Sequence, residues 1–179
     1  MPRVSLSSPG SSPPYTAPES IRMRPPPVTV PVRVRRAEVS DLDDLVALEE
    51  SSFAHDRLSR AQYRRHLDSE SAQVLVASAN HRRFLGTAVV FFRRGSKVAR
   101  LYSLATKPEA RGKGVGSALI EAAEIAARAH RCRSLRLEVR TDNVAAIGIY
   151  ERLGYTRIGT YPKYYQDGAD ALRFEKLFA

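Results

Sequence analysis

The sequence predicts an α/β fold, in which a mixed, mostly antiparallel sheet of about six to seven strands packs against about four helices. Three observations support this prediction. Apolar residues alternate or run continuously in some segments, as in strands, and recur at helical spacing in others. These segments follow the order β-α-α-β-β-β-α-β-α-β-β. At 179 residues, 43% of them hydrophobic, the chain can form a single domain with a substantial core.

The folded part is expected to begin near residue 32, because the preceding segment is rich in proline and serine. Nine of the eleven prolines lie within residues 1–31. Such a segment cannot bury enough apolar surface to offset its ordering entropy, so we predict a disordered arm at 1–31. It lacks the apolar centre of a secretory signal, and a transit peptide or a translation start at Met23 stay open as alternatives.

The first strand and the first two helices follow from short repeats. In "VPVRVRRAE", Val32 and Val34 alternate with arginines, which is typical of a strand. Ser40 is the predicted N-cap of a helix over "DLDDLVALEESSF", where leucines recur at helical spacing. A short helix over "SRAQYRRHL" starts at Ser59, and two strands, "QVLVAS" and "RFLGTAVVFFRR", follow with a polar link between them.

The later elements are separated by glycines. A turn at "RRGS" leads into a longer strand over Lys97–Thr106. An alanine-rich segment predicts a helix from Gly114 to His130. "SLRLEVR" alternates strictly, as a strand does, and "NVAAIGIYERL" predicts a helix that ends at Gly154. The last two strands are predicted at about 156–161 and 171–177.

Composition narrows the classes of partner. A formal net charge of +10 suits a nucleic acid, an acidic membrane or a phosphorylated small molecule. The arginines are spread along the chain, and no long basic run alternates with aromatic residues. We therefore expect a solvated basic surface, part of which binds an anionic ligand, and no nucleic-acid partner. No apolar run approaches the roughly 18 residues that cross a membrane, so no membrane partner is expected either.

Cysteine and histidine usage speaks against disulfide and metal chemistry. The single cysteine, Cys132, excludes an intramolecular disulfide and is expected to be a small, semi-buried residue. It fits a reducing compartment, so the predicted localisation is cytoplasmic. The four histidines are scattered without ligand spacing, and we expect no metal site.

The segment "PEARGKGVGSALI" places a glycine-rich turn between a strand and a helix. This geometry favours an anion, because exposed N–H groups and the positive end of the helix dipole meet there. The phosphate-loop pattern is absent, and G-x-G-x-x-G fails because Ser117 stands at its third glycine position. The pattern present is R-x-x-G-x-G, made by Arg111, Gly114 and Gly116, with Gly112 in addition. A glycine-rich loop without a ligand is the alternative.

This spacing, directly after an apolar strand, resembles the pyrophosphate loop of the GCN5-related N-acetyltransferase (GNAT) superfamily. The segment "LEVRTDNVAAIGIYERLGY" is similar to its second half, most closely in the RimI-type protein N-terminal acetyltransferases. The tail "KYYQDGADAL" resembles the Y-Y-x-D-G-x-D-A segment of that subgroup. The matching positions are Leu137–Arg140, Asn143, Ala146, Ile147, Tyr150, Gly154 and Tyr155, with Ile149 in place of the usual Leu.

The resemblance extends from about Val34 to the end of the sequence and is specific from Leu101 onward. It implies a single-domain GNAT-like fold over residues 32–179 and acetyl-coenzyme A (acetyl-CoA) as cofactor. The glycine loop would wrap its pyrophosphate, and the strand over 104–106 would pair with its pantetheine arm and offer an N–H to the thioester oxygen. The implied cofactor-binding residues are Leu104, Ala105, Thr106, Arg111, Gly112, Lys113, Gly114, Val115, Gly116, Ser117 and Asn143.

The same resemblance implies two catalytic residues. Glu138 matches the proton acceptor for the attacking amine, and Tyr150 matches the proton donor to the departing thiolate. By their patterns alone, Glu138 belongs to an alternating charged row typical of a solvated strand face, and Tyr150 has the spacing of a core residue. Asn143 also has the place of a helix N-cap. A peptide α-amine, with a pKa of about 8, needs only a modest base, whereas lysine, at about 10.4, needs more.

The acceptor is less well specified. Tyr161, Tyr164 and Tyr165 match tyrosines that close over a substrate N-terminus in the subgroup, although an amphipathic hairpin explains them equally. Residues 51–67 lack the aromatic and proline pattern common in RimI-type enzymes, which puts a ribosomal-protein acceptor in doubt. We expect acetyl transfer to a protein or peptide N-terminus. A small amine such as an aminoglycoside or polyamine is the alternative acceptor, and a non-catalytic acyl-CoA sensor is the alternative of another class.

Overall fold

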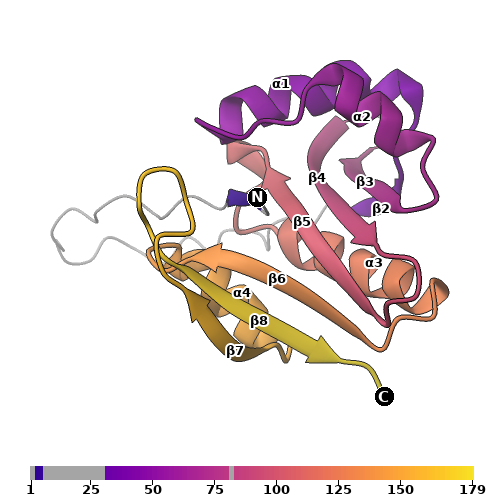
Figure 1. Ribbon diagram of the computed structural model, residues 1–179. Coiled ribbons are helices and arrows are strands. Elements are labelled where there is room, and N and C mark those ends of the chain that lie inside the picture. Colours follow the sequence, from indigo (N-terminus) through magenta and orange to yellow (C-terminus); the bar gives the residue numbers. More distant parts are fainter. Residues whose placement is uncertain (1–2, 6–30, 81–82) are drawn as a thin grey trace, which may run out of the picture.

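The computed structural model describes residues 3–5, 31–80 and 83–179 and contains one mixed sheet flanked by helices (Figure 1). The strand order is β2-β3-β4-β5-β6-β8-β7, and β1 pairs with β5 beside this path. The strands are β1 (Arg3–Ser5), β2 (Arg33–Arg36), β3 (Ala72–Ala79), β4 (Arg83–Phe92), β5 (Val98–Thr106), β6 (Ser134–Arg140), β7 (Thr156–Tyr161) and β8 (Ala171–Leu177). The helices are α1 (Leu42–Ser52), α2 (Arg60–Leu67), α3 (Val115–Ala129) and α4 (Val144–Arg152), with short 3₁₀ turns η1 (Val39–Asp41) and η2 (Pro108–Ala110).

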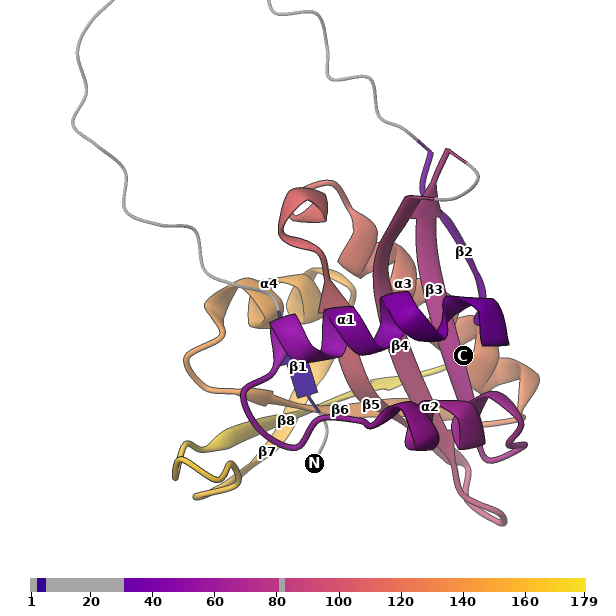
Figure 2. The ribbon, with the colours of Figure 1, turned by 90° about the horizontal axis from the view of Figure 1, so that it is seen from above.

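The helices cover the two faces of the sheet unequally. α3 and α4 pack on one face, over a large core that includes Leu101, Leu137 and Phe174. α1 and α2 pack on the opposite face over β3, β4 and β5, with Leu45 and Tyr63 in a second core (Figure 2). Strands β6, β8 and β7 lie beyond these two helices, so that side of their sheet is open.

Strands β5 and β6 separate partway along their length. Only Val98–Leu101 of β5 pairs with Ser134–Leu137 of β6, in parallel. Beyond these residues β5 continues to Thr106 and β6 to Arg140. A β-bulge accompanies the separation, because the β4–β5 register passes from Val89–Ser103 to Val90–Leu101 and so skips one residue of β5. The two strands therefore diverge towards the carboxyl end of β5.

Strand β1 lies at this divergence. Its residues Arg3, Val4 and Ser5 pair in parallel with Ser103, Leu104 and Ala105 of β5. The sequence did not predict this strand, which falls within the segment expected to be a disordered arm. The remainder of that segment, apart from residue 31, lies outside the described residues.

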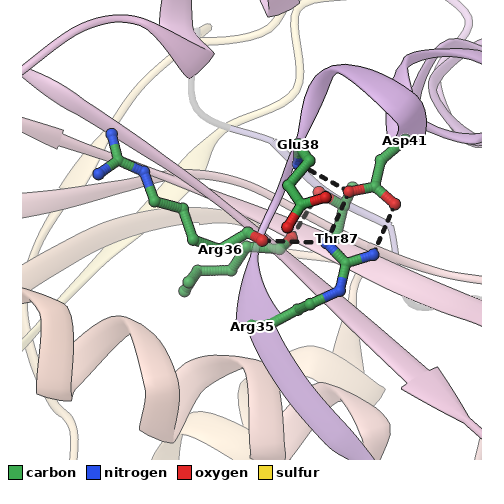
Figure 3. A network of polar contacts seen from close by, with 6 residues as sticks. Arg35, Arg36, Glu38, Asp41 and Thr87 are labelled. Atoms are coloured by element: carbon green, nitrogen blue, oxygen red, sulfur yellow. Dashed lines mark hydrogen bonds and ion pairs between the residues drawn. The ribbon is translucent and has the colours of Figure 1, made fainter. Parts of the chain in front are cut away.

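One predicted helix start is wrong and another is confirmed. Ser40 does not cap α1, because it lies inside η1, where Glu38 and Asp41 form a reciprocal capping box. The Asp41 carboxylate accepts the Glu38 N–H (2.7 Å) and two bonds from the Arg35 guanidinium (2.7 and 2.8 Å), which lowers the Asp41 pKa (Figure 3). The predicted start of the next helix at Ser59 is confirmed, and Ser59 is its N-cap, accepting the Gln62 N–H.

The predicted order of elements from β2 to β8 is confirmed, and the last two strands have the predicted bounds. Cys132 is buried, as expected. No helix in the described part of the chain is both long and apolar enough to cross a membrane.

Candidate active site

A cavity of about 760 Å³ lies between the loop that begins α3 and one side of α4. It brings together most of the residues predicted to hold a cofactor pyrophosphate. Lys113 is not among its lining residues, and its N–H is directed to the Ala110 carbonyl at 3.4 Å. The predicted residues that line the cavity are Thr106, Arg111, Gly112, Gly114, Val115, Gly116 and Ser117.

The glycines are needed here for their backbone conformation. Gly112 and Gly114 have φ of +69° and +77°, in the left-handed region that other residues rarely adopt. Gly114 is the N-cap of α3, and no side chain caps this 15-residue helix. The N–H groups of its first turn are therefore free to bind an anion, which the helix dipole also favours.

One wall of the cavity was missed by the sequence analysis. It is formed by α4, where Val144, Gly148 and Arg152 follow each other at i, i+4 and i+8 and so share one face. A Cβ on Gly148 would approach the Arg152 guanidinium to 3.3 Å, so the small residue leaves room for that cation. The helical spacing, with a glycine between an apolar and a basic residue, is a signal that could have found this wall. Asn143 caps α4 by accepting the Ala146 N–H at 3.2 Å.

Four buried hydroxyl groups have no hydrogen-bond partner among the described residues. They are the side chains of Ser103 and Thr106 on β5, of Tyr150 on α4 and of Tyr155 just after α4. Buried hydroxyls are normally paired, so such a group points to a missing partner. The backbone of Leu104 and Ala105, predicted to pair with a pantetheine arm, pairs with β1.

Glu138 lies on the open side of the sheet, opposite the core residues Leu137 and Val139. The residue is only 5% exposed, in contrast to the solvated position that its alternating row allows. Its Oε2 accepts a hydrogen bond from Arg100 Nε at 3.1 Å, and its Oε1 lies 4.0 Å from Arg173 Nε. The carboxylate is thus held between guanidinium groups from β5 and β8.

Tyr150 is fully buried in the core on the other side of the sheet. Its ring packs against Tyr155 and Phe174, with centroids at 5.7 and 6.2 Å. Burial raises the pKa of Tyr150 above its usual range, so the phenol stays protonated at neutral pH. The side chain combines a core position with an unpartnered hydroxyl.

The three predicted acceptor tyrosines lie together around the loop between β7 and β8. The rings of Tyr161 and Tyr164 stack at 5.4 Å, and Tyr165 meets Tyr164 edge-on at 5.3 Å. The Tyr164 hydroxyl accepts a hydrogen bond from Arg100 at 2.9 Å. Burial, with the nearby Glu138 carboxylate, raises the pKa of Tyr164 to about 12. Tyr164 thus shares its arginine partner with Glu138.

The β7–β8 loop is tied back to the end of β6. Arg140 donates to both oxygens of Asp142 at 3.1 Å and to Asp167 at 2.7 Å. Its guanidinium lies 5.1 Å from the centre of the Tyr165 ring. Both carboxyl groups have lowered pKa values because of these bonds from Arg140.

A contact between two distant loops completes this side of the site. The Gln166 amide donates to the Asp56 carboxylate at 2.9 Å, joining the β7–β8 loop to the α1–α2 loop. Asp56 and Lys163 both have positive φ, +55° and +50°, so each loop bends sharply. The α1–α2 loop is further held by the buried Glu49, which accepts the Leu58 N–H (2.7 Å) and the Tyr63 hydroxyl (2.9 Å).

The described residues contain no group of three or more histidine, cysteine or acidic side chains that could hold a metal ion. The candidate site thus offers a buried carboxylate on one side of the sheet, a buried phenol on the other, a cluster of tyrosines and an uncapped helix start.

Comparison with known proteins agrees with this arrangement. Residues 40–155 match the acetyltransferase (GNAT) family. A Bacillus subtilis protein assigned as a ribosomal protein bS18-alanine N-acetyltransferase is 31% identical over 142 residues, covering 78% of this chain and 91% of the relative. An uncharacterized N-acetyltransferase of Methanocaldococcus jannaschii is 44% identical over 73 residues, covering 40% of this chain and 47% of the relative. The chain is thus matched to about half the length of one of these relatives and nearly the whole of the other.

Among solved structures, the fold is similar to that of the ribosomal-protein-S18-alanine N-acetyltransferase of Escherichia coli. The TM-score is 0.69 at 25% sequence identity, and the match covers 80% of this chain and 92% of that one.

Proposed function

The chain belongs to the acetyltransferase (GNAT) family, whose members are acetyl-CoA-dependent acyltransferases, and we propose that it acetylates the α-amino group of a peptide or protein N-terminus. The observation that carries this proposal is that Arg100 binds both the Glu138 carboxylate and the hydroxyl of Tyr164, in a β7–β8 loop that contacts the α1–α2 loop. A carboxylate with a tyrosine cluster beside it and an open groove leading away from it suits an extended chain end better than a compact metabolite.

The residues present fit acetyl-CoA. The uncapped start of α3 and the Arg111 and Arg152 side chains would hold its pyrophosphate, and the edge of β5 at Leu104–Thr106 would hold its pantetheine arm. Bound there, the cofactor would supply the acetyl group, as a thioester, near the place where β5 and β6 separate. Since β1 pairs with the same edge, it has to leave before that arm can pair with Leu104 and Ala105.

Glu138 is proposed to take the proton that the acceptor amine loses, directly or through one water molecule. Arg100 orients this carboxylate and also holds the Tyr164 hydroxyl, so base and acceptor pocket are positioned by one side chain. A peptide amine is substantially neutral near pH 7 to 8, so a carboxylate is a sufficient base.

Tyr150 is proposed to give its proton to the thiolate that leaves when the amide bond forms. Its buried, raised-pKa phenol is a proton donor and not a base at neutral pH. The hydroxyl has no competing partner among the described residues, so it is available to a sulfur atom at the divergence. Glu138 then passes its proton to solvent and Tyr150 recovers one, so the protons balance.

The test is coenzyme A release from acetyl-CoA with peptides that differ in their first residue and with a panel of small amines. Peptides with a free N-terminus should be turned over, and blocking the N-terminus should abolish turnover. Glu138→Gln should lower kcat by about a hundredfold or more, a usual effect of removing a general base. Glu121→Gln, an exposed carboxylate on α3, is the matched control and should act like wild type.

Turnover of small amines alone would replace this proposal with a metabolite acetyltransferase. Binding of acetyl-CoA without turnover of any acceptor would favour an acyl-CoA sensor.

A further inference from the structure

A groove of about 450 Å³ extends from Glu138 along the open side of the sheet. Tyr161 borders it, at the end of β7. In the ribbon, β6, β8 and β7 lie beyond α1 and α2 (Figure 1). One of its ends is the proposed catalytic carboxylate, so an acceptor whose amine reaches Glu138 can place its next residues here.

The groove is lined by more cations than anions. Arg93, Arg100, Arg136 and Arg173 contribute guanidinium groups, and Glu138 is the one carboxylate among its lining residues in the described part of the chain. Arg136 is also paired outside the lining, since its Nε lies 2.9 Å from Glu175 Oε1. Within the lining, one carboxylate thus faces four guanidinium groups.

The cations differ in how fully they are engaged. Arg100 is bound to Glu138 and to the Tyr164 hydroxyl. The buried Nε atom of Arg173 has no hydrogen-bond partner among the described residues. Its guanidinium lies 4.5 Å from the centre of the Tyr161 ring and 4.0 Å from Glu138. A buried guanidinium N–H without an acceptor favours a ligand that brings an anionic oxygen.

The strand geometry sets how far this cation lies from the reacting amine. Arg173 stands directly opposite Glu138 in the β6–β8 register, and Arg136 precedes Glu138 by two residues on the same face of β6. Positions two apart on a strand are about 6–7 Å apart. An acceptor amine at Glu138 therefore brings the side chains of its second and third residues within reach of Arg173 and Arg136.

We propose that this groove selects N-termini carrying an acidic side chain at the second or third residue, with Arg173 as the main selecting group. The proposal rests on the proposed N-terminal acetyltransferase function and adds the chemical class of its acceptor. The excess of guanidinium groups also disfavours lysine- or arginine-rich N-termini and polyamines, because they would bring like charges together in a partly enclosed space.

The experiment compares peptides that share a first residue and carry Glu, Gln or Lys at positions two and three. The measured quantity is the ratio of kcat/KM between the Glu and Lys peptides, at low and at high salt. We expect the Glu peptide to be favoured by about tenfold or more, mainly through KM, and the ratio to fall with salt.

Two variants test the residue assignment. Arg173→Gln should bring the Glu-to-Lys ratio of kcat/KM close to one. Arg173→Glu should reverse the preference in favour of the Lys peptide. Arg157→Gln removes an exposed arginine of β7 that does not line the groove and should leave the ratio unchanged. Thermal unfolding of each variant verifies that it is folded, and a reversal of preference cannot arise from loss of folded protein.

Equal turnover of all three peptides, or a preference for the Lys peptide in the wild type, would overturn the acidic preference and leave the proposed activity intact. A preference that survives both Arg173 variants would overturn the role of Arg173. Absence of turnover with every peptide would reject the proposed function, and this inference with it.

Discussion

The cavity at the start of α3 and the groove beyond Glu138 differ in what lines them. The cavity is formed by glycines, the first turn of a helix and the edge of a strand, so backbone groups do most of the binding. The groove is formed by charged and aromatic side chains of five strands, β4 to β8, and of the β4–β5 turn. The cavity depends mainly on one continuous stretch of sequence, with α4 as its second wall, whereas the groove depends on how several distant segments are brought together.

This contrast explains why the cofactor half of the site, which is the cavity, was predicted better than the acceptor half, which is the groove with the β7–β8 loop. The glycine loop and its helix are contiguous, and their pattern alone located them. Glu138 and Tyr150 were singled out by resemblance, but their surroundings were not: Arg100 is 38 residues from Glu138 and 64 from Tyr164. The Asp56–Gln166 contact spans 110 residues. No local periodicity encodes such pairs, because they follow from the strand order.

The sharpest test of the contrast is at Tyr150, which belongs to both the core and the proposed chemistry. Tyr150→Phe keeps the ring and removes only the hydroxyl, so kcat should fall by about a hundredfold while stability changes little. Tyr150→Ala should instead lower the free energy of unfolding by about 3–5 kcal/mol, because it empties a fully buried site. Kinetics and thermal unfolding of both variants separate the two roles. A Phe variant with wild-type kcat would leave Tyr150 as a core residue only.

The acceptor half can be perturbed alone at Arg140. Arg140→Gln removes the bonds to Asp142 and Asp167 that tie the β7–β8 loop. The acceptor KM should rise by about fivefold, since the loop that carries Tyr164 and Tyr165 is held less firmly. The affinity for acetyl-CoA, measured by calorimetry, should not change. A parallel loss of both affinities would show that the two halves are not independent.

The same variant has an expected pH dependence. Arg140 lowers the pKa of both carboxyl groups in the folded protein, so the stabilisation is present at neutral pH and is lost as pH falls through those lowered values. The difference in melting temperature between wild type and Arg140→Gln should therefore be constant above about pH 5 and shrink below about pH 4. A constant difference down to pH 3 would contradict this assignment.

The smallest expected effect concerns the cofactor half. Val4→Pro removes a backbone N–H from β1 and weakens its pairing with Leu104. If β1 and the pantetheine arm share this edge, the variant should bind acetyl-CoA about two- to threefold more tightly, since losing a strand pairing of three residues changes a competing equilibrium only modestly. Val4→Ala, which keeps the backbone N–H, is the control. Unchanged or weaker binding would show that β1 does not compete with the cofactor.

By itself, the sequence determined the order of elements from β2 to β8, the position of the glycine loop, the start of α2 at Ser59 and the side of β6 on which Glu138 stands. Each of these depends on residues within one or two turns or strands of each other, where period and backbone preference act directly. Only the tertiary structure decided that β5 and β6 diverge, that β1 occupies the exposed edge, and that Glu138 is held by Arg100 and faced by Arg173. These features depend on which strands become neighbours and in what register, and that is settled by packing of the whole sheet and its two helical layers.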